Sequence, residues 1–155
     1  MEAKKILISN KEIAFLYIIF FVGIIGHLYH HLQNLMLLLT PATLLLTGLI
    51  VLFYSYKSST NNFLLWAALT YIITFILEAI GVKTGMIFGR YTYGSTLGIK
   101  LFEVPLIIGF NWVFVILGSI SISRIITTNL YLGSLISAFI AFVFDLILEP
   151  IAIKL

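Results

Sequence analysis

FLLWAALTYIITFILEAIGV, residues 63–82, decides the fold, because twenty consecutive residues contain a single charged side chain, Glu78. A helix that crosses about 30 Å of hydrocarbon needs roughly 20 apolar residues. An ionisable group at membrane depth is costly, so it is by default a candidate functional residue. The segment therefore predicts a membrane-spanning helix with a candidate site near its C-terminal end.

The rest of the chain has the same character. Of its 155 residues, 61% are hydrophobic and 10% are charged, and the mean hydropathy is +1.15, which excludes an ordinary soluble domain. Cysteine is absent, which excludes disulfides and thiol chemistry, and the few basic residues form no nucleic-acid patch. We predict an all-α fold, a polytopic transmembrane helix bundle forming a single integral-membrane domain over residues 1–155. The expected spans are about 12–31, 35–56, 63–82, 101–123 and 130–153.

Short connections join these spans, except for KTGMIFGRYTYGSTLGIK, residues 83–100, which is rich in Gly, Tyr and Thr. Glycine suits tight turns, and tyrosine suits the headgroup region of a membrane. Five basic residues fall on the side of the N-terminus, termed side A, and four fall on the opposite side B. This small excess favours a cytoplasmic N-terminus.

Ionisable side chains gather toward the side-B ends of the expected spans. Polar residues at helix ends also reach the interface without any function. Side A has no comparable set of acids, so we favour a functional site on side B. The residues concerned are His27, His30 and His31 on the first span, Glu78 on the third, Glu103 on the fourth, and Asp145 and Glu149 on the fifth.

Helical spacing places several polar residues of the third span on one face. Tyr71, Thr74, Glu78 and Gly81 follow one another at intervals of three and four residues. A carboxyl group that faces neighbouring helices can keep its proton and act as a general acid. The alternative is a hydrogen bond that only holds helices together.

The fifth and fourth expected spans offer further groups. Asp145 and Glu149 are four residues apart, and joint ionisation of such a pair is disfavoured, so one can carry a proton while the other acts as a base. Glu149 can instead be solvated at the interface. In the fourth span, Glu103 and Asn111 share a face, although Glu103 also suits a helix N-terminus electrostatically. Trp112 is expected to pack in the core or against lipid, with substrate stacking as the alternative.

The pattern H-x-x-H-H at His27, His30 and His31 lies on one face of the first expected helix. It resembles one histidine box of the membrane di-iron desaturases, which need about eight histidines, whereas this chain has three. A mononuclear site of histidine and carboxylate is the remaining metal alternative, and interfacial histidines are the default interpretation.

The string EAIGVKTGMIFGRYTY, residues 78–93, is the most distinctive in the chain. Its pattern E-x-x-G-x-x-T-G-x-x-F-G-x-Y-x-Y resembles the membrane carotenoid-biosynthesis family that contains the carotenoid 1,2-hydratases and the bisanhydrobacterioruberin hydratases. The resemblance covers roughly residues 70–155. Such proteins look as though they continue beyond the element that corresponds to Glu149-Pro150. We therefore expect this chain to be either a short member or a C-terminally truncated one. Further matches are Leu97-Gly98, Val104-Pro105, Trp112, Asp145 and Glu149-Pro150.

The resemblance implies a cofactor-independent, metal-free hydratase that adds water to the C1=C2 bond of the ψ end group of a linear carotenoid such as lycopene. It implies a multi-pass protein of the cytoplasmic (inner) membrane of a prokaryote, whose partners are a lipophilic polyene and membrane lipid. Glu78 or Asp145 would be the acid while the other positions water, and Glu149 would tune the pair. The expected substrate-binding residues are Thr84, Tyr91, Tyr93, Glu103, Asn111 and Trp112.

Two other functions fit the same residues. Lycopene cyclisation also begins with alkene protonation, but it excludes water and captures the cation with an internal double bond. A non-catalytic membrane protein, for binding or transport, is the second alternative. A carrier should show inverted halves or broken spans, and no such symmetry is evident in the sequence.

Overall fold

A computed structural model describes residues 10–59, 62–86 and 91–152, with side chains to residue 147. Within these residues, five α-helices are long and apolar enough to cross a membrane, which confirms the predicted all-α polytopic fold. A short 3-10 helix, η1 (His30–Leu32), and a two-stranded antiparallel hairpin, β1 (Lys100–Leu101) and β2 (Val104–Pro105), complete the described elements. The α-helices are α1 (Asn10–Leu28), α2 (Gln33–Ser58), α3 (Phe63–Thr84), α4 (Leu106–Ile126) and α5 (Leu130–Ala152).

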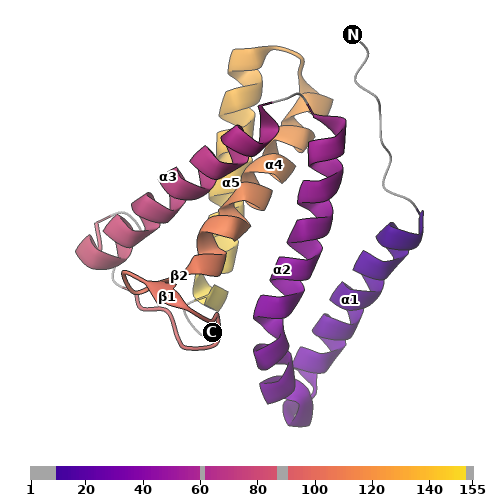
Figure 1. Cartoon of the computed structure of the whole chain (residues 1–155), viewed down its shortest axis with the longest axis vertical. Helices are drawn as coiled ribbons and strands as arrows, with labels where there is room; N and C mark the ends of the chain where they lie inside the picture. Colours follow the sequence, from indigo (N-terminus) through magenta and orange to yellow (C-terminus); the bar gives the residue numbers. More distant parts are fainter. Residues whose placement is uncertain (1–9, 60–61, 87–90, 153–155) are drawn as a thin grey trace. The chain divides into compact units, whose positions relative to one another are not determined.

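The residues group into two compact units, Met1–Trp66 and Ala67–Leu155. In the first unit, α1 and α2 pack against each other and are joined by η1 (Figure 1). The Tyr54 hydroxyl of α2 donates a hydrogen bond to the Glu12 carboxylate of α1, which ties the two helices together.

The prediction that His27, His30 and His31 share one face of a helix is wrong. The helix α1 ends at Leu28, and Tyr29 adopts an extended conformation before η1 begins at His30. His30 and His31 therefore belong to the turn, while His27 remains in α1 with its Nδ1 2.8 Å from the Gly23 carbonyl oxygen. The physical reason is that the chain must reverse here to enter α2.

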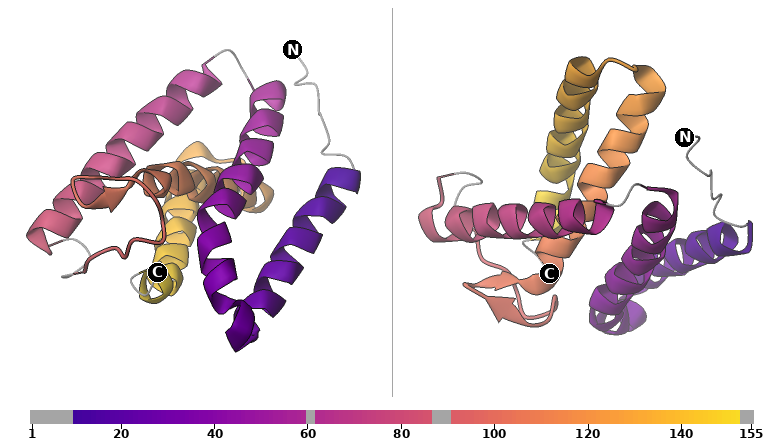
Figure 2. Two further views of the ribbon diagram at one scale, coloured as in Figure 1. Left: turned by 60° about the horizontal axis from the view of Figure 1, so that its bottom comes forward. Right: turned by 45° about the horizontal axis from the view of Figure 1, so that its top comes forward.

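The second unit contains most of α3, the hairpin, α4 and α5. The helices α4 and α5 lie side by side and are joined by a short connection, as the right view of Figure 2 shows. The α3 helix meets the start of α4, where the Tyr71 hydroxyl donates a 3.0 Å hydrogen bond to the Leu106 carbonyl oxygen. Gly109 permits this approach, because a Cβ there would lie 3.0 Å from a Tyr71 ring carbon and 3.2 Å from Phe75 Cβ.

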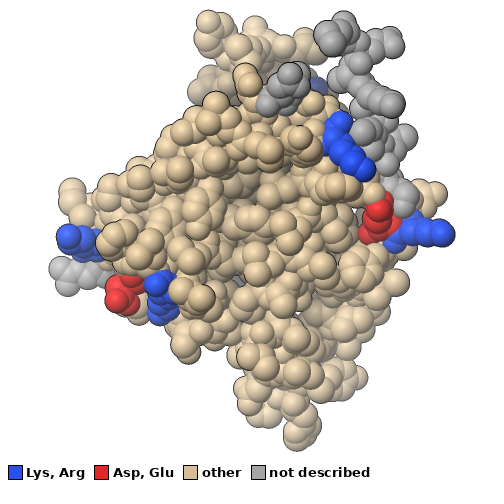
Figure 3. Space-filling view, viewed as in Figure 1, with Lys and Arg blue, Asp and Glu red and all other residues tan. Residues whose placement is uncertain are grey.

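The surfaces of these helices are apolar, and the face shown in Figure 3 is mostly free of charged side chains. Large hydrophobic side chains are exposed on several of the described helices, including Ile125 at 86% and Leu38 at 74%. A soluble protein rarely exposes apolar surface on this scale, whereas lipid-facing helices do so as a rule. The exposure pattern agrees with the length and hydropathy of the helices.

The fourth helix begins at Leu106, so the prediction that it begins at Leu101 is wrong. Leu101 pairs with Val104 across a two-residue turn, in which Phe102 and Glu103 have φ angles of 53° and 65°. Positive φ at both positions is the geometry of a tight hairpin turn. Glu103 therefore lies outside α4 and does not share a helical face with Asn111. Pro105 has φ −61° and forms the N-cap of α4, where its missing N–H leaves no bond unmade.

Candidate functional site

Glu78 is the centre of the candidate site. It lies on α3, is only 5% exposed, and accepts hydrogen bonds from two phenols. The Tyr91 hydroxyl donates to Oε1 of Glu78 at 2.5 Å, and the Tyr93 hydroxyl donates to the same oxygen. Both phenols therefore bind the same carboxyl oxygen of Glu78. The three residues form the Glu78–Tyr91–Tyr93 cluster.

The described residues of the loop after α3, residues 85–86 and 91–99, include both tyrosines that bind Glu78. Gly85 ends the helix with φ 65°, and its N–H donates to the Gly81 carbonyl oxygen, a left-handed helix cap that suits glycine. The rings of Tyr91 and Tyr93 pack edge to face with centroids 5.4 Å apart. Lys100 Nζ of β1 donates a 2.6 Å hydrogen bond to the Tyr93 carbonyl oxygen. The hairpin therefore holds the loop in place.

The electrostatics of the cluster keep the phenols protonated. Burial raises the pKa of Tyr91, and the hydrogen bond with Glu78 and its charge raise it further. Burial also raises the pKa of Tyr93, followed by the charge of Glu78 and the hydrogen bond to it. The charge of Asp145 adds to the rise in the pKa of Tyr91, so α5 contributes a second carboxyl group to this neighbourhood. Both tyrosines are therefore hydrogen-bond donors at neutral pH.

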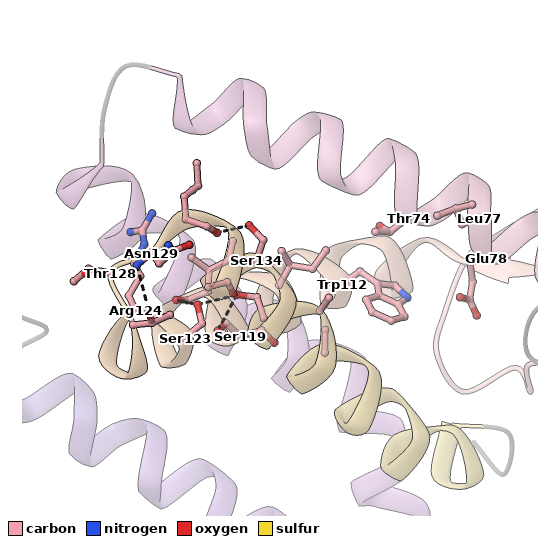
Figure 4. Close-up of a pocket in the computed structure, with 18 residues that line it drawn as sticks. Thr74, Leu77, Glu78, Trp112, Ser119, Ser123, Arg124, Thr128, Asn129 and Ser134 are labelled. Atoms are coloured by element: carbon pink, nitrogen blue, oxygen red, sulfur yellow. Dashed lines mark hydrogen bonds between the residues drawn. The ribbon is translucent and has the colours of Figure 1, made fainter.

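A cavity of about 880 Å³ lies between α3, α4 and α5 of the second unit. Figure 4 shows Glu78 and Trp112 at one end and Arg124, Thr128 and Asn129 at the other. Its lining is mostly apolar, which suits a lipophilic ligand. The lining residues are Thr74, Leu77 and Glu78 of α3; Trp112, Ile116, Ser119, Ile120, Ser123 and Arg124 of α4; Thr127, Thr128 and Asn129 of the connection; and Leu130, Gly133, Ser134, Ser137, Ala138 and Ala141 of α5.

The sequence interpretation missed the serines that line this cavity. Ser119 and Ser123 are buried on α4, and the Ser137 hydroxyl of α5 lies 2.8 Å from the Ser123 hydroxyl. Ser137 Oγ also lies 2.8 Å from its own Gly133 carbonyl oxygen. The available signal was the concentration of serine on both sides of the short α4–α5 connection, since small polar residues are frequent where membrane helices meet.

The structure brings together some of the predicted residues and separates others. Tyr91 and Tyr93 contact Glu78 directly, and Trp112 lines the same cavity. Asp145 is half-buried on α5 and acts on Tyr91 through its charge. The fold therefore brings together five of the predicted site residues: Glu78, Tyr91, Tyr93, Trp112 and Asp145.

The remaining predicted residues have other positions. Thr84 is exposed at the end of α3, where its hydroxyl donates to the Ile80 carbonyl oxygen at 2.7 Å. Glu103 is exposed in the hairpin turn, and Asn111 is half-buried on α4. Glu149 lies on α5, but its side chain is outside the described part of the chain.

The comparisons with known proteins bear on three quarters of the chain. A family model described as carotenoid biosynthesis protein matches residues 39–155. These residues include α3, the loop with Tyr91 and Tyr93, the hairpin, α4 and α5. No curated protein and no solved structure gives a significant match. Together with its five apolar helices, the match shows a multi-pass membrane protein. The chain belongs to the carotenoid biosynthesis protein family.

Proposed function

We propose that this protein hydrates the ψ end group of a linear carotenoid by adding water across the C1=C2 bond. The observation that carries the proposal is the position of Glu78, a buried carboxyl group at one end of an apolar cavity with two phenols bound to a single oxygen. A trisubstituted alkene is a weak base, so its protonation needs a strong acid held away from bulk water.

Glu78 is the acid in this mechanism. Its Oε2 proton passes to C2, the alkene π pair forms the new C–H bond, and a tertiary cation remains at C1. The negative charge that develops on Glu78 strengthens the hydrogen bonds from Tyr91 and Tyr93. The raised pKa of each phenol keeps it a donor throughout this step. The two tyrosines therefore favour release of the proton.

Asp145 is the base. A water oxygen bonds to C1, and the proton that the water loses passes to the Asp145 carboxylate, which completes a tertiary alcohol. Tyr91 donates to Oε1 of Glu78 and is influenced by the charge of Asp145, so both carboxyl groups act on one phenol. The proton returns from Asp145 to Oε2 of Glu78 before the next turnover. The net reaction consumes one water and leaves both carboxyl groups in their initial state.

The cavity suits the rest of a polyene. Apolar side chains such as Leu77, Ile116 and Ile120 line it, while small residues such as Ala138 and Ala141 leave room along α5. The polyene enters from the bilayer of a prokaryotic cytoplasmic membrane, and its end group lies against Glu78 and Trp112.

Product mass from lycopene-producing cells tests the proposal, with the wild-type chain beside Glu78→Gln and Asp145→Asn. We expect a gain of one or two waters with the wild type and its loss in Glu78→Gln. Glu12→Gln removes the carboxylate that binds Tyr54 in the first unit and serves as the control. A product of unchanged mass would support the cyclase alternative, and unaltered lycopene would support a binding role. Full turnover in both Glu78→Gln and Asp145→Asn would reject the assigned roles.

A further inference from the structure

Lys100 of β1 binds a member of the Glu78–Tyr91–Tyr93 cluster. Its Nζ donates a 2.6 Å hydrogen bond to the carbonyl oxygen of Tyr93, seven residues earlier in the chain. Lys100 is half-buried, and it is not among the residues that line the cavity. Any effect of Lys100 on a polyene held in the cavity therefore passes through the residue that it binds.

The backbone that carries Lys100 is fixed by the start of α4. In the hairpin, Lys100 pairs with Pro105. The next residue, Leu106, donates its N–H to the Ile99 carbonyl oxygen at 2.9 Å. The Leu106 carbonyl oxygen in turn accepts the 3.0 Å hydrogen bond from Tyr71 of α3. The lysine side chain therefore extends from a backbone that is tied to the helix of the proposed acid.

Three contacts determine where the Tyr93 hydroxyl lies. Lys100 holds the Tyr93 backbone at its carbonyl oxygen, and the Tyr91 ring packs edge to face against the Tyr93 ring with centroids 5.4 Å apart. The hydroxyl itself donates to Oε1 of Glu78. A tyrosine has only two side-chain torsions between its backbone and its ring, so a fixed backbone leaves the hydroxyl few positions.

An ammonium group is well suited to hold a carbonyl oxygen. It donates hydrogen bonds and accepts none, and a bond from an ionised donor is roughly twice as strong as one between neutral groups. A methionine at position 100 would have a long, unbranched side chain without a donor. The hydrogen bond to Tyr93 is therefore the property that distinguishes lysine from an apolar residue at this position.

We propose that Lys100 is a positioning residue for the reaction, which holds the Tyr93 hydroxyl against Oε1 of Glu78 while Glu78 releases its proton. The proposal rests on the proposed hydration. Lys100 gains and loses no proton in this step. Its contribution is that the charge that develops on Glu78 meets a donor already in place, so no part of the barrier goes to bringing the phenol back.

The first test measures hydrated carotenoid per unit of folded protein in variants at position 100. Lys100→Met should lower turnover roughly 10-fold, because it removes a charge-assisted hydrogen bond. Lys100→Arg, which keeps an ionised donor, should restore most of the turnover, and Lys100→Gln, which keeps a neutral donor, should lie between the two. Lys83→Met changes an exposed lysine at the end of α3 and is the matched control.

Double variants show whether Lys100 acts through Tyr93. In a Tyr93→Phe background the hydroxyl is already absent, so Lys100→Met should cost less than about twofold more. In a Tyr91→Phe background Tyr93 still has to be positioned, so Lys100→Met should cost its full effect. A general loss of stability would lower turnover equally in both backgrounds.

A second readout needs no catalysis. Burial and the contact with Glu78 raise the pKa of Tyr93, so this phenol keeps its proton at about pH 11, one unit above the ordinary value. Comparing the ultraviolet absorbance of each protein with that of its own Tyr93→Phe variant isolates the titration of Tyr93. In Lys100→Met the phenol should ionise at a lower pH than in the wild type, whereas Lys100→Arg and Lys83→Met should resemble the wild type.

Three results would overturn the proposal. One is turnover by Lys100→Met within about twofold of the wild type. The others are an equal loss in the Tyr93→Phe and Tyr91→Phe backgrounds, and a Tyr93 titration that Lys100→Met leaves unchanged. A wild-type chain that forms no hydrated product would reject the proposed function, and the titration would then still decide whether Lys100 holds the Tyr93 hydroxyl on Glu78.

Discussion

Tyr91 donates its phenolic hydrogen to Oε1 of Glu78 at 2.5 Å, although the two residues are 13 positions apart in the sequence. Tyr93 binds the same oxygen from the same loop, so one carboxyl group is oriented by two neutral donors. The arrangement orients the carboxyl group and prepares it for negative charge. It also ties the loop between α3 and β1 to the α3 helix.

Removal of either phenol should slow the reaction without unfolding the protein. A hydrogen bond to a charged acceptor contributes about 1.5–3 kcal/mol, so Tyr91→Phe or Tyr93→Phe should lower turnover by roughly 10- to 100-fold. The double variant should lose more than either single variant. Quantifying hydrated carotenoid per unit of folded protein checks this, with Tyr131→Phe, at an 83% exposed position, as the control. Turnover equal to that of the wild type in both single variants and in the double variant would show that the two phenols take no part in the mechanism.

The same two phenols should make stability depend on alkaline pH. Their native pKa values are raised above the unfolded value of about 10, so above that pH the unfolded chain releases protons that the native chain keeps. The stabilisation is complete below about pH 10 and is lost progressively as the pH rises further. Unfolding midpoints in detergent at about pH 9 and pH 11 should differ more for the wild type than for Tyr91→Phe/Tyr93→Phe. An identical difference in both proteins would contradict the raised pKa values.

Two glycines of α4 should respond to alanine in opposite directions. At Gly109, a Cβ would approach the Tyr71 ring and Phe75 to 3.0–3.2 Å, so Gly109→Ala should cost about 1–3 kcal/mol of unfolding free energy. At Gly118, nothing lies within 4 Å of the added Cβ, and Gly118→Ala should stabilise the helix by about 0.5–1 kcal/mol. Unfolding of both variants in the same detergent measures the difference. The same sign for both would show that α3 does not pack against Gly109.

The hairpin turn should be stabilised by glycine. Glu103 has φ 65°, and the left-handed conformation costs a residue with a Cβ roughly 1–2 kcal/mol. Glu103→Gly should therefore raise the unfolding midpoint, while Glu103→Ala, which keeps the Cβ, should not. Activity measured on both variants tests the predicted substrate contact of Glu103, because a contact made by the carboxylate is lost equally in the two.

A larger side chain in the cavity should exclude the substrate. Ala141 lines the cavity on α5, whereas Leu135 of the same helix is 70% exposed and faces outward. Ala141→Phe should abolish conversion of a long polyene, and Leu135→Phe should leave conversion unchanged. Measuring carotenoid retained by the purified variants distinguishes blocked binding from impaired chemistry. Normal retention and turnover in Ala141→Phe would place the substrate outside this cavity.

Much of the fold could be predicted because span length and hydropathy are local properties. The third helix begins at Phe63 as expected and ends at Thr84, two residues beyond the expected end at residue 82. The hairpin was not predictable, because Phe102 and Glu103 lack the Asn or Gly that normally identifies such a turn. Pro105 was compatible with a first helical turn, and only the pairing of Leu101 with Val104 shows that the helix starts later.

The site was partly predictable for a related reason. Glu78 stood out because a charge inside an apolar span is conspicuous, and Tyr91 and Tyr93 stood out because they are close to it in sequence. The hydrogen bonds to a single oxygen depend on the path of the loop and on Lys100, which helical periodicity does not describe. Ser119 and Ser123 are ordinary residues in a span until α5 is placed beside them.

The contact between α4 and α5 has a mechanical consequence. When the helices separate at Ser137, its hydroxyl keeps the Gly133 carbonyl oxygen of its own helix as a partner, and Ser123 keeps the Ile120 carbonyl oxygen. Both serine hydroxyls thus have a hydrogen-bond partner within their own helix. A hydrogen bond between two membrane helices contributes only about 0.6 kcal/mol on average. The serine contacts therefore help to set the register of α4 against α5, and side-chain packing supplies most of the free energy that holds the two helices together.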